Sequence, residues 1–317
     1  MQERRISGRV LVIGLLIAVA IGVLLLFGNG LLSSGSDWRV TDEGMLQYLV
    51  STPEYQQKLI EDANDSTLYA ISLASKDTQI EALLRIPRTN KSEADRGNAD
   101  GKTESNNLPG IVLLPGATVT KEREQGLARY LSSLGFASIT IDQRNLGGTD
   151  QQGDWQMFLQ GDEPTEHKMV YDALAAAEVL RSQPEVDPNR IIYAGESNGG
   201  RFAIIAGALD ARAKGVVAVS TCGYGTDEAV RSGRFTDPEM VKFLRSIDPE
   251  TYLGEITPRP FVMIHSRNDT VISFAYAEDT YAKALMPKSF HAVGCAKHGY
   301  CTEMNAYLEE ELKKMAS

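Results

Sequence analysis

The sequence predicts an α/β protein whose mainly parallel central sheet carries helices on both faces and a small cap insertion, preceded by an N-terminal transmembrane helix. Three observations support this. The chain has 317 residues, enough for one large buried core. From Thr78 onward, short Val- and Ile-rich runs alternate with longer helical patterns, as in parallel sheets covered on both faces. The first 32 residues contain an unbroken apolar run.

Composition excludes several classes of protein. Hydrophobic residues make up 43% and charged residues 23%, which is ordinary for a globular chain. The net charge of -10 offers no general attraction for phosphate backbones, so we expect no nucleic-acid partner. Nothing in the sequence indicates a cofactor, and it leaves the oligomeric state open.

The N-terminus differs from the rest of the chain. Every residue from Val10 to Phe27 is apolar or Gly, and a helix of this length spans about 27 Å, close to the thickness of a bilayer core. Arg4, Arg5 and Arg9 precede the run, which favours a cytoplasmic N-terminus. We therefore expect a basic cytoplasmic segment at 1–9, a signal anchor at 10–32 and a single-pass protein of the cell membrane whose remaining chain is extracytoplasmic. A cleaved signal peptide and a buried core helix are the alternatives.

Residues 33–77 are expected to form a linker and an N-terminal extension, in which 45–60 is a helix or strand without a defined place. The main domain is expected at 78–317. Within it, 87–109 is expected to be a mobile loop, because it has almost no apolar residue larger than Ala before Leu108. Strands are expected at 79–86, 110–114, 136–141, 190–194, 216–220, 260–264 and 289–293. Helices are expected at 122–134, 166–182, 201–209, 274–285 and 303–314.

A candidate nucleophile follows the strand at 190–194. The segment Gly195-Glu196-Ser197-Asn198-Gly199 is a G-x-S-x-G at a strand-to-helix junction. A serine on such a sharp turn crowds its neighbours, so Gly195 and Gly199 leave room where a Cβ would clash. The pattern predicts that Ser197 stands above the sheet edge, at the N-terminus of a helix.

In this context the chain resembles the α/β-hydrolase superfamily from about residue 78 to its end, most closely the dienelactone-hydrolase-like and prolyl-oligopeptidase-like branches. That superfamily orders its triad as serine, acid and histidine, each just beyond a strand. The strand ending at His265 is followed by Asp269, which matches the acid loop. The last strand is followed by Gly294-Cys295-Ala296-Lys297-His298, which matches the histidine loop.

The resemblance implies that His298 acts as general base, Asp269 orients it and an acyl-enzyme forms on Ser197. The oxyanion hole would use the N–H groups of Asn198 and Ala117. Pro115 in the same loop has no N–H and is excluded as a donor. The turn 142–149 resembles a common D-x-R-G-x-G motif and is interpreted as mainly structural.

Other assignments stay open at this point. His265, His291 and His167 are alternative bases. His265 is expected to pack or to support a loop, whereas His291 lies within a predicted edge-region strand and His167 at the start of a helix. Asp142 also ends a strand and is the alternative acid. Glu196 is expected to be a turn or pocket-lining residue.

Three cysteines add one more question. Cys295 and Cys301 bracket His298, and Cys222 lies elsewhere. A Cys295–Cys301 disulfide would suit an oxidising compartment, and free thiols are equally compatible with the sequence. A metal site is the third interpretation, but we expect no metal, because the three ligands lie so close together in sequence and a site would consume the expected base.

The region 221–257 is expected to be a cap insertion over the pocket or a set of helices that pack on the sheet. A small, partly apolar lid suits a small-molecule ester or acyl substrate. We therefore expect a serine esterase. The alternatives are a serine peptidase or amidase of the prolyl-oligopeptidase-like type and a non-catalytic binding module.

Overall fold

The structure, a computed structural model, describes residues 37–88 and 107–317. The expected anchor at 10–32 lies outside these residues, as does most of the expected loop at 87–109. In the part of the chain that is described, no helix is long and apolar enough to cross a bilayer. Two short strands, β1 (Trp38–Val40) and β2 (Leu46–Tyr48), come first, and Val40–Ser317 forms one compact unit.

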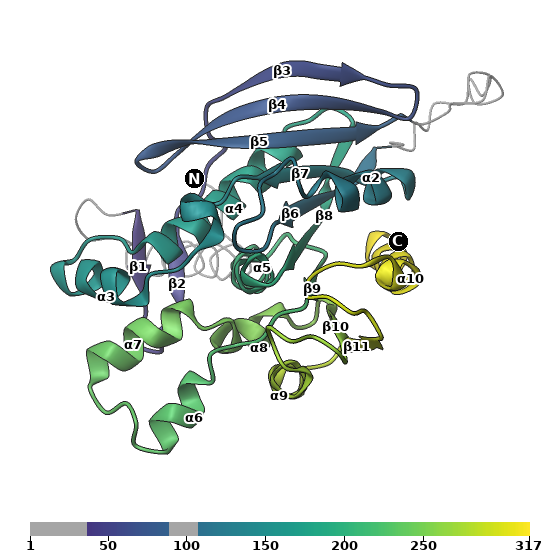
Figure 1. Cartoon of the computed structure of the whole chain (residues 1–317). Coiled ribbons are helices and arrows are strands. Elements are labelled where there is room, and N and C mark those ends of the chain that lie inside the picture. The colour runs from purple at the N-terminus through teal and green to yellow at the C-terminus, as the bar shows by residue number, and fades with distance from the viewer. Residues whose placement is uncertain (1–36, 89–106) are drawn as a thin grey trace, which may run out of the picture. The chain divides into compact units, whose positions relative to one another are not determined.

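A nine-stranded sheet forms the centre of this unit, in the order β11-β10-β9-β8-β6-β7-β5-β4-β3 (Figure 1). The strands from β6 onward pair in parallel with one another, whereas β3, β4 and β5 pair antiparallel and β5 is antiparallel to β7. This confirms the mainly parallel sheet. The strands are β3 (Tyr55–Asp62), β4 (Ser66–Ser75), β5 (Thr78–Pro87), β6 (Leu108–Leu114), β7 (Ala137–Ile141), β8 (Val186–Glu196), β9 (Gly215–Val219), β10 (Phe261–Ser266) and β11 (Lys288–Val293).

The sheet begins earlier in the chain than the sequence predicts. We expected the domain to start at residue 78, but β3 and β4 belong to its main sheet and lie along the edge seen at the top of Figure 1. β4 joins β5 through a tight turn in which Lys76 has a φ of 52°. β3 is an edge strand, and all of its residues after Tyr55 are exposed, so it carries no apolar alternation that could reveal it.

Alternating strand residues form two cores. Val112 and Leu114 of β6 face one core, and Ile111 and Leu113 face the other. The first core is covered by α4 (Thr165–Arg181) and α5 (Asn198–Leu209), and the second by α2 (Gln125–Ser133) and α10 (Asn305–Ala316). The expected helices on both faces are therefore confirmed, with bounds shifted by a few residues.

The remaining helices follow the strand ends. The region 221–257 contains α6 (Thr226–Arg231), α7 (Pro238–Ile247) and α8 (Leu253–Ile256), and α9 (Phe274–Lys283) follows β10. The sequence analysis missed α3 (Gln151–Gln160), which contacts α7. Asp150 caps this helix by accepting the Gly153 N–H, and Gly161 ends it in a left-handed conformation. Glycine inside the helix and weak apolar periodicity explain why it was overlooked.

Candidate active site

Ser197 occupies a sharp turn between β8 and α5. Its backbone has φ 53° and ψ -122°, a combination that costs energy for any residue with a Cβ. A Cβ on Gly195 would collide with the Gly199 carbonyl, and one on Gly199 would collide with the carbonyl oxygens of Leu114 and Pro115. The two glycines therefore allow the turn that holds Ser197 at the carboxyl end of the parallel strands.

Asp269 and His298 are in direct contact. Oδ2 of Asp269 accepts a hydrogen bond from Nδ1 of His298 at 2.8 Å, and the carboxylate side chain is fully buried. Its Oδ1 accepts the N–H groups of Val271 at 2.9 Å and Ile272 at 3.0 Å. Burial opposes ionisation of Asp269, but the hydrogen bonds from His298, Ile272 and Val271 outweigh it and hold the pKa of Asp269 below its usual value. The carboxylate thus fixes both the ring orientation and the Nδ1–H tautomer of His298.

The second ring nitrogen of His298, Nε2, is available to accept a proton. Nε2 is buried and has no hydrogen-bond partner among the described residues, including Ser197. The histidine loop sits directly against the nucleophile turn, because Oε2 of Glu196 accepts the Tyr300 N–H at 2.7 Å. Catalytic hydrogen bonds are often long in unliganded enzymes and shorten when substrate binds. The geometry therefore suits Nε2 as the acceptor of a proton from Ser197.

Two backbone N–H groups near the nucleophile are the expected oxyanion donors. A Cβ on Gly116 would lie 3.3 Å from Cβ of Ser197, so the loop after β6 closely approaches the serine. In the next residues, Thr118 donates its N–H to the Leu146 carbonyl at 2.6 Å. Within the described residues, neither Ala117 N–H nor Asn198 N–H donates a hydrogen bond. Both are therefore free to stabilise a developing oxyanion.

The other histidines and Asp142 have partners of their own. His265 is fully buried, with Nε2 2.9 Å from the Ile272 carbonyl oxygen and 3.5 Å from Asp269 Oδ2. Nε2 of His291 contacts Glu311 at 2.8 Å, and Nε2 of His167 contacts Ser246 at 2.7 Å. Asp142 accepts the N–H of Lys121 and pairs with its ammonium group. The burial and contacts of His265 agree with the expectation that it packs and supports a loop.

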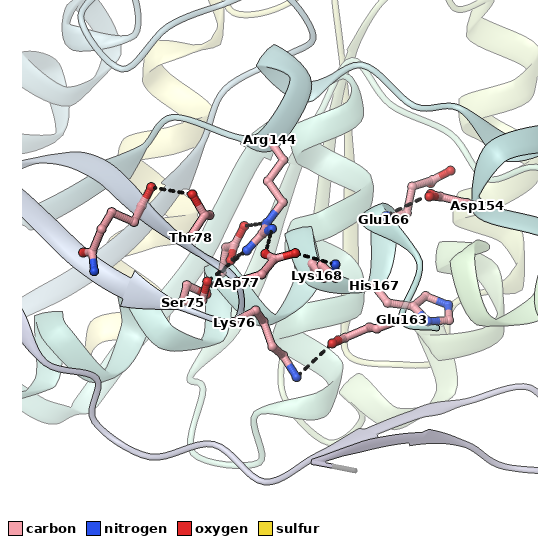
Figure 2. A network of polar contacts seen from close by, with 12 residues as sticks. Ser75, Lys76, Asp77, Thr78, Arg144, Asp154, Glu163, Glu166, His167 and Lys168 are labelled. Atoms are coloured by element: carbon pink, nitrogen blue, oxygen red, sulfur yellow. Dashed lines mark hydrogen bonds and ion pairs between the residues drawn. The ribbon is translucent and has the colours of Figure 1, made fainter. Parts of the chain in front are cut away.

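The turn at 142–149 is held by an ionic network. The Arg144 guanidinium hydrogen-bonds Asp77, in the turn between β4 and β5 (Figure 2). It also hydrogen-bonds Asp172 of α4. The side chain of Asp172 is only 1% exposed. These contacts agree with the expectation that the turn at 142–149 has a mainly structural role.

Cys295 and Cys301 are joined by a disulfide that closes the loop containing His298, and Cys222 is a buried free thiol. The same two sulfurs and Glu303 form the one group of potential metal ligands within the described ranges. Because the sulfurs are bonded to each other, they offer no thiolate to a metal ion.

The sequence analysis missed a polar cluster beside the serine. Arg201, one helical turn after Ser197, donates to Asn198 Oδ1 at 2.7 Å and to the Tyr224 hydroxyl at 3.2 Å. Tyr224 in turn lies 3.5 Å from Glu166 Oε2. Burial, followed by the charge of Asp154, raises the pKa of Glu166 to about 8. The sequence offered one signal for this cluster, the polar residue Arg201 four positions after Ser197. The partners of Arg201 are distant in sequence, so the cluster could not be predicted.

Comparisons with known proteins agree with this geometry. The family model "Acetyl xylan esterase (AXE1)" matches residues 100–256. Among solved structures, the acetyl xylan esterase from Paenibacillus sp. R4 superposes with a TM-score of 0.65 at 18% identity, covering 83% of this chain and 89% of that one. The chain thus has the α/β-hydrolase fold, and its segment 100–256 is similar to the acetyl xylan esterase family. The glucuronoyl esterase from Solibacter usitatus has the same fold, with a TM-score of 0.60 at 14% identity over 89% of this chain and 90% of its own.

Curated relatives of this chain match over shorter stretches. The uncharacterized protein YfhR of Escherichia coli O157:H7 is 25% identical over 43% of this chain and 47% of its own length. The polyketide transferase claH of Penicillium crustosum is 30% identical over 39% of this chain and 38% of its own length. The chain thus spans less than half of these relatives. The family match and the esterases of the same fold agree with the expected serine hydrolase of esterase type.

Proposed function

We propose that this α/β-hydrolase is a membrane-anchored serine esterase that cleaves a small carboxylic ester through an acyl-enzyme intermediate. The observation that carries the proposal is the 2.8 Å hydrogen bond between buried Asp269 and His298, in a loop docked on the turn of Ser197. This contact leaves Nε2 of His298 as the basic nitrogen, which a serine nucleophile requires.

In the proposed reaction, Nε2 of His298 takes the proton of Ser197 as Oγ bonds to the ester carbonyl carbon. The N–H groups of Asn198 and Ala117 stabilise the negative oxygen that forms. The tetrahedral intermediate collapses, the alcohol leaves with the proton from His298, and an acyl-serine remains. Water then gives a proton to His298 and attacks the acyl group, so that the acid departs and Ser197 regains its proton.

Two observations favour an ester of a polar, hydroxylated alcohol such as a sugar. The matching family and the solved structure from Paenibacillus sp. R4 are named for acetyl esters of xylan. In this chain, Arg201 lies one helical turn after Ser197 and contacts Tyr224, which in turn contacts Glu166, so a cluster of hydrogen-bonding groups begins beside the serine. An acetyl ester on a sugar is therefore the first substrate to test.

The test uses the full chain, the S197A variant and a matched control, S182A, which removes an exposed hydroxyl at the end of α4. Each protein is treated with a fluorophosphonate probe, then with p-nitrophenyl esters of increasing acyl length and with acetylated xylose. We expect labelling and acetate release by the wild-type protein and S182A, both lost in S197A. Labelling without ester turnover would favour a peptidase or amidase, and a folded, unlabelled protein would favour a binding module.

We further propose that residues 10–32 anchor the protein with the hydrolase domain outside the cytoplasm. The arginines before the apolar run support this orientation, and the Cys295–Cys301 disulfide suits an oxidising compartment. Protease added to intact cells is expected to digest the domain. A domain protected until the membrane is opened would contradict this orientation.

A further inference from the structure

The histidine loop rests on a carboxylate beside the nucleophile. Glu196 Oε2 accepts the Tyr300 N–H at 2.7 Å across 104 residues of sequence. A Cβ on Gly299 would lie 2.9 Å from the same oxygen, and Gly299 has a φ of +83°, which suits glycine. The two residues that follow His298 are therefore fitted to the position of the Glu196 carboxylate.

A second carboxyl group lies against Glu196. Glu124 comes immediately before α2 and is 4% exposed, and its carboxyl group interacts with that of Glu196. Its Oε1 has no hydrogen-bond partner among the residues described. A buried carboxyl group next to a second, partly exposed one favours a state in which one of the two carries a proton and donates it to the other. We assign the proton to Glu124, because burial, followed by the charge of Glu196, raises the pKa of Glu124 to about 9.

We propose that Glu124 and Glu196 are positioning residues for His298. The protonated Glu124 holds the Glu196 carboxylate in the position where it accepts the Tyr300 N–H of the histidine loop. The position of this loop in turn sets the distance from His298 to Ser197. This inference rests on the function proposed above. Neither side chain needs to touch substrate, since both act through the loop that carries the base.

The arrangement predicts an alkaline limit to catalysis. The titratable groups facing Glu124 are Glu196 on the nucleophile turn and Lys297 and Tyr300 on the histidine loop. When Glu124 loses its proton, its carboxylate repels the carboxylate of Glu196. This repulsion displaces Glu196, which accepts the Tyr300 N–H. With a pKa of about 9, the protonated fraction falls about tenfold between pH 8 and pH 10. The value of kcat should fall by the same factor, with little change in KM.

The experiment measures kcat and KM for p-nitrophenyl acetate from pH 6 to pH 10 on the full chain, after subtraction of spontaneous hydrolysis. The variants are E124Q, E196Q and a control, E122Q, whose side chain is 60% exposed and lies in the turn before the same helix. In E124Q the amide can donate to Glu196 at every pH, so the ratio of kcat at pH 10 to kcat at pH 8 should rise to about one. E122Q should keep the wild-type decline. E196Q should lower kcat about 10- to 100-fold at pH 7, through misplacement of His298.

A wild-type alkaline decline in E124Q, or a neutral-pH kcat in E196Q equal to that of the wild-type, would overturn the inference. If E124Q does not fold, infrared titration of the wild-type protein should find a buried protonated carboxyl group that ionises near pH 9. Its absence would also overturn the inference. These results are separable from the proposed function, because fluorophosphonate labelling at pH 8 tests Ser197 directly and the infrared titration needs no turnover.

Discussion

The side chain of Asn198 donates a hydrogen bond to the carbonyl oxygen of Gly147 at 2.9 Å, which ties the residue after the nucleophile to the turn after β7. Gly147 also lies against Ala117, since a Cβ on it would be 3.2 Å from Cα of Ala117. The two expected oxyanion donors are therefore connected through one glycine.

Replacement of Asn198 by alanine tests this connection. The variant keeps the backbone N–H but loses the hydrogen bonds to Gly147 and Arg201. We expect kcat for p-nitrophenyl acetate to fall about tenfold, because the two donors lose their fixed spacing. The control is N189A, which removes an exposed amide from β8. Equal kcat values in N198A and N189A would show that the side chain has no role in positioning the donors.

Asp269 is expected to be the acid of the triad. The D269N variant keeps the size of the side chain, but its amide no longer stabilises the Nδ1–H tautomer of His298. We expect kcat to fall about 10⁴-fold, with circular dichroism close to that of the wild-type protein.

The alternative acid, Asp142, provides the matched control. Its carboxylate pairs with Lys121, so D142N should weaken a loop contact and leave most of the activity. If D142N lost activity and D269N retained it, the assignment of the acid would be reversed.

Local pattern was sufficient to predict most of the sheet. The buried strands β6, β7 and β9 are short, apolar runs, and their neighbours in sequence are amphipathic helices, so periodicity locates them. The same reasoning failed for β3, whose exposed residues YQQKLIED form an edge strand without a buried face. It also failed at the boundary at residue 78, because pairing of β3 and β4 with β5 is a long-range property.

The residues of the candidate site also fall into two groups, those that the sequence predicts and those that it does not. Ser197, Asp269 and His298 could be predicted because each follows a strand, and the glycines around Ser197 have a steric reason to be there. Glu124, Arg201 and Glu166 could not be predicted as part of the site, because their partners are distant in sequence and come close only when the chain folds. A single glutamate before a helix has no distinguishing pattern until Glu196 is seen beside it.

Arg144 is expected to be important for stability. Its Nε and Nη2 atoms donate to Asp172 at 2.7 and 3.1 Å, and Nη1 donates to Asp77 at 2.5 Å (Figure 2). R144A would leave the carboxylate of Asp172 buried without its cation. We expect the free energy of unfolding, measured with urea, to fall by about 3–5 kcal/mol.

The control for this network is D77N. The side chain of Asp77 is 56% exposed, so loss of its charge should cost less than about 1 kcal/mol. Similar losses in R144A and D77N would show that burial of Asp172 is not what makes Arg144 important.

The Cys295–Cys301 disulfide should restrain the loop of His298. Protein denatured without reductant is expected to have one free thiol, Cys222, whereas three would show that the bond is absent. Replacing both cysteines by serine should lower the free energy of unfolding by about 2 kcal/mol, because the closed loop is short. We also expect kcat to fall, since the loop that carries His298 loses its closure, whereas C222S should retain the wild-type value.

Glu166 should make stability fall as the pH rises. Its pKa is raised to about 8 in the folded protein, first by burial and then by the charge of Asp154. The folded chain therefore holds this proton more tightly than the unfolded chain does, so the contribution of Glu166 to stability is complete below about pH 4.5 and is lost as the pH rises to about 8.

The E166Q variant has no such group to ionise. We expect its melting temperature to decline less than that of the wild-type protein between pH 5 and pH 8.5, with the exposed-site variant E309Q following the wild-type curve. Parallel curves for E166Q and the wild-type protein would mean that Glu166 is already ionised in the folded chain at neutral pH, with Arg201 as its counter-charge.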